Sequence, residues 1–309
     1  MDIKKLVMIA LAAGSLTVFV GCGDDNGGDG GGGGDGGGGT CDVEVPVCDI
    51  AADLSPAAGC LEDAGAEPPQ NIRVTTITIP SAAEGVGFNL DCTNTGKTDD
   101  FGCRKADVGD GVDNALAALN PLLGTMKIDL NEQISQGIGN GYDSAIQFNI
   151  VIQGWDGEAD DDCVVLGLED ATTGTPVAEP VAAVVAGGVV KAVVSALPLV
   201  IPFGDPGEEV LLNINIQNAR VVLPIDASGV TDGFIAGHVI WEEEGAEDDL
   251  ESLVRKVIED LDSTTVDFDT AAGLITGLLD MHVEGVSEDA CSCDALSVGL
   301  KVSGENELN

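Results

Sequence analysis

The sequence has 309 residues, with 54 acidic residues against 12 Lys and Arg, and its formal net charge at pH 7 is −42. This charge repels phosphate backbones and anionic head groups, which argues against nucleic acid and anionic lipid surfaces as partners. Apolar residues nevertheless make up 44% of the chain. They recur in stretches rich in Val, Ile and Leu, so we expect a folded core rather than a disordered chain.

The N-terminus has the pattern of a secretory signal. A basic start (residues 4–5) is followed by an apolar run (residues 6–20) that ends just before Cys22. The run is shorter than the about 20 residues that a membrane-spanning helix needs. Residues 19–22, Phe-Val-Gly-Cys, resemble the lipobox of bacterial lipoproteins, with Phe19 where Leu is usual.

The lipobox resemblance covers residues 1–22 only. It implies that residues 1–21 are removed and that Cys22 is acylated, for example with palmitate, which would anchor the protein to a membrane of the cell envelope. The acidic residues that follow Cys22 favour the outer membrane or the cell surface. Residues 23–40, almost all Gly and Asp, would be a tether with an r.m.s. reach of roughly 25 Å. The remaining body, residues 41–309, is similar in style to surface lipoproteins of Gram-negative bacteria.

The chain has nine cysteines, and eight remain when Cys22 is set aside. An even number in an exported chain predicts up to four disulfides. We expect Cys92 to pair with Cys103 in a disulfide-stapled structure whose N-terminal cap is residues 41–70. Cys291 and Cys293 are too close in sequence to pair with each other, so we expect each to reach a distant partner and to pin the C-terminus to the N-terminal Cys cluster. No Cys-x-x-Cys pair supports the alternative of a zinc site. The disulfide candidates are Cys41, Cys48, Cys60, Cys92, Cys103, Cys163, Cys291 and Cys293.

The first half of the body mixes strand and helix patterns. A β-branched run over residues 73–80 and a short alternation over residues 88–90 predict two strands. Apolar spacings of three and four residues then predict helices over residues 115–123 and 129–137. Alternation returns over residues 142–155, where we expect a third strand.

The second half is dominated by alternating apolar residues. Strands are expected at residues 163–168, in a pair over residues 181–203 with a turn or bulge at Gly187 and Gly188, in a meander over residues 209–241, and finally over residues 295–302. Helices are expected at residues 247–261 and 271–279. The pattern therefore predicts a single mainly β body with a few helices, as an antiparallel sheet or sandwich with helical insertions.

Two acidic segments are candidate calcium sites, because hard carboxylate oxygens suit Ca²⁺. One contains Asp156, Glu158, Asp160 and Asp162, with Asp161 between them, in a loop that is not an EF-hand. The other consists of Asp107, Asp110, Asp113 and Asn114, although capping of the next helix by Asp110 or Asp113 explains it equally well. Solubilising surface charge is the alternative for both segments.

Catalytic motifs are missing from the sequence, which contains no GxSxG, SxxK or HExxH pattern. Only His238 and His282 could serve as an imidazole base, and both fall in segments where a structural role is typical. We therefore hypothesise a non-enzymatic envelope lipoprotein with a structural or binding role and an unidentified envelope partner. The alternatives are a carboxylate- or calcium-dependent hydrolase, and a carrier of an apolar ligand, which needs a cavity on the order of 300–1,000 Å³.

Overall fold

The computed structural model of the protein describes residues 51, 54–62, 67–92, 94, 103, 107–108, 111–125, 129–138, 146–203, 210–242, 249–260, 267–283 and 293–307. The signal sequence, Cys22 and the tether lie outside these residues, so secretion and lipidation remain predictions. The candidates Cys41, Cys48, Asp110 and Cys291 also lie outside them.

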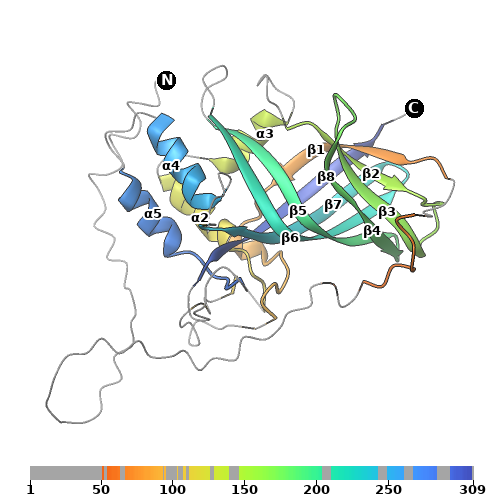
Figure 1. Cartoon of the computed structure of the whole chain (residues 1–309), viewed down its shortest axis with the longest axis horizontal. Helices are drawn as coiled ribbons and strands as arrows, with labels where there is room; N and C mark the ends of the chain where they lie inside the picture. Colours follow the sequence, from red (N-terminus) through yellow and green to blue (C-terminus); the bar gives the residue numbers. More distant parts are fainter. Residues whose placement is uncertain are drawn as a thin grey trace, which may run out of the picture.

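Eight antiparallel strands form one closed barrel in which each strand pairs with its neighbours along the chain and β8 pairs with β1 (Figure 1). The mainly β class with helical insertions is confirmed, and the sheet closes on itself instead of forming a two-sheet sandwich. The strands are β1 (Gln70–Thr78), β2 (Phe148–Gln153), β3 (Asp161–Asp170), β4 (Pro176–Ala186), β5 (Val189–Phe203), β6 (Val210–Asp226), β7 (Gly229–Ile240) and β8 (Ala295–Asn306).

Helices are inserted in two of the connections between strands. The β1–β2 connection carries a short 3-10 helix, η1 (Ala82–Glu84), and the helices α2 (Ala115–Thr125) and α3 (Leu130–Gly137). The β7–β8 connection carries α4 (Leu250–Asp260) and α5 (Phe268–Thr276). The strand expected at residues 88–90 is wrong: Phe88 makes only an isolated bridge to Asp113.

The barrel interior is aliphatic because side chains alternate between the two faces of each strand. The core cluster contains only Ile, Val, Leu and Ala, and none of its buried members exposes more than 8% of its surface. A bulge in β1 between Val74 and Thr76 shifts the alternation, so that both Val74 and Ile77 join this core. On β7 and β8, the buried polar residues His238 and Ser297 alternate with interior residues and therefore face outward.

The β4–β5 hairpin confirms the expected turn at Gly187 and Gly188, whose φ angles are +60° and +77°. Positive φ at both central residues is typical of a two-residue hairpin turn, and Gly adopts it without strain. Pairing between the two strands stops after three residue pairs, and beyond them β5 pairs with β6 alone. Pro180 and Pro198 lie in these diverging stretches, where their missing amide hydrogens reduce the donors offered to another strand.

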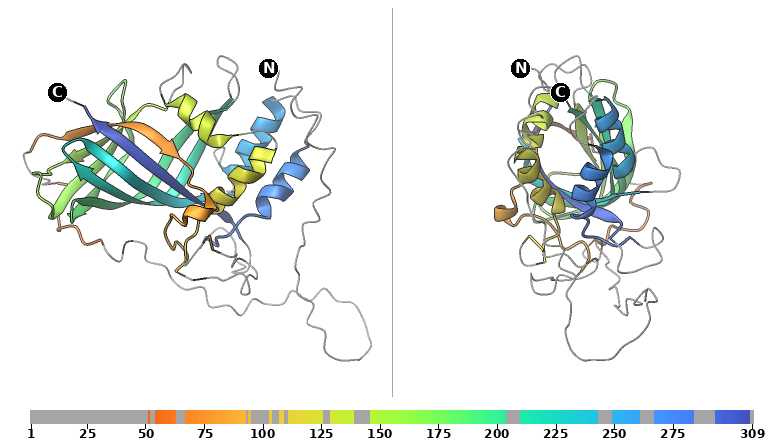
Figure 2. Two further views of the ribbon diagram at one scale, coloured as in Figure 1. Left: turned by 180° about the vertical axis from the view of Figure 1, so that it is seen from behind. Right: turned by 90° about the vertical axis from the view of Figure 1, so that its left-hand side faces the viewer.

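The helices gather at one end of the barrel, whereas the C-terminus lies at the other (Figure 2). Helix α3 contacts β1 and β5, on opposite sides of the barrel, and its Ile134 is fully buried in the core. The Asn131 side chain bonds both the N–H and the C=O of Ile79. Helix α3 therefore packs against this end of the barrel and contacts both sides of it. No helix in the described part of the chain combines the length and apolar character needed to cross a membrane.

Candidate functional site

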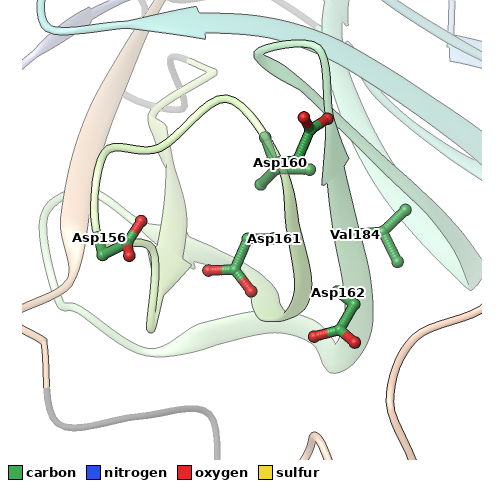
Figure 3. Close-up of a pocket in the computed structure, with 6 residues that line it drawn as sticks. Asp156, Asp160, Asp161, Asp162 and Val184 are labelled. Atoms are coloured by element: carbon green, nitrogen blue, oxygen red, sulfur yellow. The ribbon is translucent and has the colours of Figure 1, made fainter.

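The acidic loop between β2 and β3 borders a shallow, open depression at the end of the barrel opposite the helices. It has a volume of about 490 Å³ and is lined by four aspartates and two valines. Figure 3 shows that the carboxylates of Asp160 and Asp162 point to opposite sides. Glu158 is exposed in the same loop. The predicted ligands share one surface, but their oxygens do not converge on one point. The lining residues are Asp156, Asp160, Asp161, Asp162, Val184 and Val185.

Three of these carboxylates bind backbone amides instead. The Oδ1 atoms of Asp156, Asp160 and Asp161 accept hydrogen bonds of 2.8–2.9 Å from the N–H groups of Glu158, Gly187 and Cys163. Short Asp-to-backbone bonds of this kind are typical of turns. Within the described ranges, no group of three His, Cys, Asp or Glu residues could hold a metal ion. The loop is thus organised by its backbone contacts.

Side chains of the second acidic segment also accept hydrogen bonds from backbone N–H groups. Asp113 Oδ2 accepts hydrogen bonds from the N–H groups of Leu90 (2.6 Å) and Asp91 (3.2 Å). Asn114 Oδ1 accepts from Ala117 N–H at 3.2 Å, which makes Asn114, and not Asp113, the N-cap of α2. The structure therefore does not bring Asp113 and Asn114 together as metal ligands.

The acidic loop is accordingly expected not to mediate any stabilisation by calcium. The change in melting temperature between EDTA and millimolar Ca²⁺ should agree within about 1 °C for the full-length protein and for its Asp156→Asn/Asp160→Asn variant, because only a ligand bound to the native state through these carboxylates would make the two differ. Glu179→Gln, which changes an exposed acid outside the loop, is the matched control. A rise in melting temperature on addition of Ca²⁺ that is lost in the Asp156/Asp160 variant, but kept in Glu179→Gln, would contradict the expectation.

A more highly organised cluster lies along one edge of β8. Strand β1 pairs with β8 only as far as Thr78 and Lys301, so the backbone of residues 295–299 needs other partners on that edge. Asn114 supplies the first of them: its Oδ1 accepts from the N–H of Gly299 at 3.0 Å, and its Nδ2 donates to the C=O of Gly299 at 3.5 Å. One side-chain amide thus replaces a missing strand at this position.

The next two positions along the edge are paired in the same way. Ser297 N–H donates to Asp280 Oδ1 at 2.8 Å, and Ala295 exchanges two 3.1 Å backbone hydrogen bonds with Met281. In an antiparallel strand, alternate residues direct their backbone groups to the same side. The hydrogen bonds at these three positions, Gly299, Ser297 and Ala295, therefore continue the ladder where β1 has ended. We call this set the β8 edge network: Asn114, Asp280, Met281, Ala295, Ser297 and Gly299.

Ser297 and Asp280 have the composition of a nucleophile beside a carboxylate base. Ser297 Oγ donates to Asp280 Oδ2 and accepts from the N–H of Ala115 at 2.7 Å, at the start of α2. The serine is 0% exposed, however, so a substrate could not contact its hydroxyl. The pair consequently stabilises the edge of β8 and the start of α2.

Burial changes the titration of the carboxyl groups around this edge. Removal from water raises the pKa of Asp280 to about 7, although hydrogen bonds from Ser297 oppose the change. Burial and the nearby carboxylate of Asp91 raise the pKa of Asp113 to about 8. Both groups therefore titrate near neutral pH, where ordinary aspartates are fully ionised.

The two histidines lie apart from the predicted acidic residues. His238 is 6% exposed, and burial lowers its pKa to about 4. Its Nε2 has no hydrogen-bond partner among the described residues. His282 Nδ1 donates to Asp294 Oδ2 at 2.8 Å, and Asp294 was not a candidate. Neither histidine is thus assembled with a candidate acid into a hydrolytic site.

The cysteines correct one sequence-based expectation. Cys60 and Cys163 form a disulfide that ties the segment before β1 to β3, as expected for a stapled cap. Cys92 is exposed and disulfide-bonded, whereas Cys103 is a buried thiol. The expected Cys92–Cys103 pair is therefore wrong. Cys103 lies instead against Cys293, with which it forms a hydrogen bond.

Comparison with protein-family models, curated proteins and solved structures finds no match to this chain, so its sites are interpreted from their geometry. Sequence reasoning singled out Asn114 in the β8 edge network, but as a calcium ligand, and it missed Asp280, Ser297 and nearby Asp294. The only local signal for Ser297 is a polar residue in an alternating strand. That signal is equally typical of a solvent-facing position.

Proposed function

We propose that the protein is a lipid-anchored envelope protein whose barrel acts as a non-enzymatic structural or binding module. The observation that carries this proposal is the packed aliphatic interior, whose central residues, among them Ile72, Ile152 and Ile216, are fully buried. An eight-stranded barrel is small enough for its own side chains to fill, although barrels of this size can also hold one small ligand. An interior of this kind offers no polar group to a substrate, so recognition of a partner would use the outer surface.

The same observation argues against a carrier of apolar ligands. A ligand cavity of several hundred Å³ would leave its lining side chains with exposed surface. The central core residues Ile72, Ile152, Val190 and Ile216 are instead 0% exposed. The described interior is thus filled by the protein itself, and the large content of Val, Ile and Leu serves the core.

The attachment of the N-terminal segment suits a tethered module. The Cys60–Cys163 disulfide and a 2.8 Å hydrogen bond from Ala57 N–H to Asp162 O hold this segment at the start of β3. The helices lie at the opposite end of the barrel (Figure 2). A tether arriving from an anchor at Cys22 would therefore join the end that the helices leave free.

Replacing Cys22 with Ser is expected to abolish membrane anchoring, because only a cysteine thiol can be acylated at this position. Full-length protein expressed in a Gram-negative host should partition into the detergent phase of Triton X-114 and carry the added mass of acyl chains at Cys22. The Cys22→Ser variant should move to the aqueous phase.

Cys41→Ser is the matched control, because it removes another cysteine of the N-terminal segment and should leave partitioning unchanged. Recovery of the unaltered protein in the aqueous phase, with no added mass, would refute lipid anchoring. Saturable turnover of a substrate by the barrel would separately refute the non-enzymatic role.

A further inference from the structure

Two thiols that are far apart in the sequence meet beside the β8 edge network. Cys103 belongs to the connection between β1 and α2, and Cys293 lies two residues before β8. Cys103 is only 8% exposed and Cys293 is half-buried. The two side chains form a hydrogen bond with each other, so their sulfur atoms lie next to each other in the folded protein.

The surroundings of this pair do not suit a reactive or metal-binding thiol. The hydrogen bond to Cys293, burial, and the carboxylates of Asp280 and Asp294 raise the pKa of the Cys103 thiol far above its ordinary value. A thiol with a raised pKa is a poor nucleophile and a poor metal ligand, because both roles need the thiolate. A covalent link between the two sulfurs is the chemistry that the arrangement favours.

We propose that Cys103 and Cys293 are joined by a disulfide in the exported protein. The link would form during export, before folding buries the Cys103 thiol and raises its pKa, by exchange with a protein or small-molecule disulfide donor. The thiolate of one of the two cysteines attacks the donor, forms a mixed disulfide and releases one donor thiol. The thiolate of the other cysteine then attacks the protein sulfur of the mixed disulfide and releases the second donor thiol. Two protein thiols are oxidised, and one donor disulfide is reduced.

This disulfide would fasten the β1–α2 connection to the entry of β8, beside the edge where side chains replace β1. It would also assign the remaining cysteines by elimination. Cys60 is bonded to Cys163 and Cys92 is already in a disulfide. The partner of Cys92 would then be one of three cysteines outside the described residues: Cys41, Cys48 and Cys291.

Peptide mapping of the full-length exported protein tests the pairing directly. The protein is alkylated without reduction and digested with trypsin, which places Cys103 alone in residues 98–104 and Cys291 and Cys293 together in residues 257–301. We expect residues 98–104 to be recovered almost entirely as a cross-link to residues 257–301 and to be released on reduction.

Two single variants distinguish the neighbouring cysteines. In Cys293→Ser, residues 98–104 should appear as an alkylated free thiol, whereas in the matched control Cys291→Ser the cross-link should persist. Recovery of alkylated Cys103 from the unaltered protein would overturn the proposal. A cross-link of residues 98–104 to residues 74–97, which contain Cys92, would also overturn it, as would a cross-link that survives Cys293→Ser.

A second measurement examines the consequence for stability. Replacing both Cys103 and Cys293 with Ser should lower the melting temperature by on the order of 5–10 °C relative to the oxidised protein, because a disulfide restricts the unfolded chain. The same change should have no effect when both proteins are fully reduced beforehand. An equal melting temperature for the oxidised protein and the variant would contradict a structural link.

Discussion

The Asn114→Ala variant is expected to lose about 3 kcal/mol of unfolding free energy, since one side chain performs two tasks. Asn114 is 1% exposed. It caps α2 through the N–H of Ala117 and pairs the buried backbone of Gly299, which β1 leaves without a strand partner. Loss of an N-cap costs about 1 kcal/mol, and a buried N–H without a partner costs about 1–3 kcal/mol. Urea denaturation followed by circular dichroism measures the difference.

A matched control separates the two tasks of Asn114. Asp129 caps α3 through a 3.1 Å hydrogen bond from the N–H of Glu132 and is exposed to solvent, so Asp129→Ala removes a cap alone. This variant should lose only about 1 kcal/mol. Equal losses in the two variants would mean that the bond to the edge of β8 contributes nothing.

Stability is expected to fall as the pH rises from about 6 to 9.5, with Asp113 and Asp280 as the cause. Their pKa values in the folded protein are raised to about 8 and about 7, whereas an unfolded aspartate titrates near pH 4. The folded state holds these protons more tightly, so the stabilisation is complete below about pH 4 and is lost as the pH rises through 7 and 8. The loss should be on the order of 3 kcal/mol.

The Asp113→Asn variant should show a smaller loss over the same range and should be more stable than the unaltered protein at pH 9.5. The amide keeps an oxygen that can accept from the N–H of Leu90, but it carries no charge to bury. Chemical denaturation at several pH values provides the measurement. His238 affects only the lowest part of this range, because its lowered pKa of about 4 makes stability fall only as the pH drops from about 6.5 towards 4.

Asp226→Asn is the control for this pH dependence. Asp226 is exposed, and hydrogen bonds from Ser228 lower its pKa. Its contribution is therefore present throughout the measured range and is lost only in acid. The slope between pH 6 and 9.5 should match that of the unaltered protein. Two results would show that these carboxyl groups do not control stability. One is a free energy of unfolding for the unaltered protein that does not change with pH; the other is the same dependence on pH in Asp113→Asn as in the unaltered protein.

The sequence by itself determined the local elements whose signal lies within a few residues. Alternation in β6 and β8 identified strands, because every second side chain of a strand faces the core. The paired glycines Gly187 and Gly188 identified a hairpin turn, because they adopt positive φ without strain. Neighbouring side chains along the chain carry both signals, so neither depends on what the element packs against.

Only the tertiary structure decided how these elements meet. The same alternation suits a flat sheet, a sandwich or a barrel. Closure of the barrel depends on pairing between β1 and β8, which are the first and last strands in the sequence. The approach of Cys103 to Cys293, and the replacement of β1 by Asn114 and Asp280 along β8, follow from where β1 ends. Contacts between residues so distant in sequence leave no local pattern, because each partner is chosen by the topology of the whole chain.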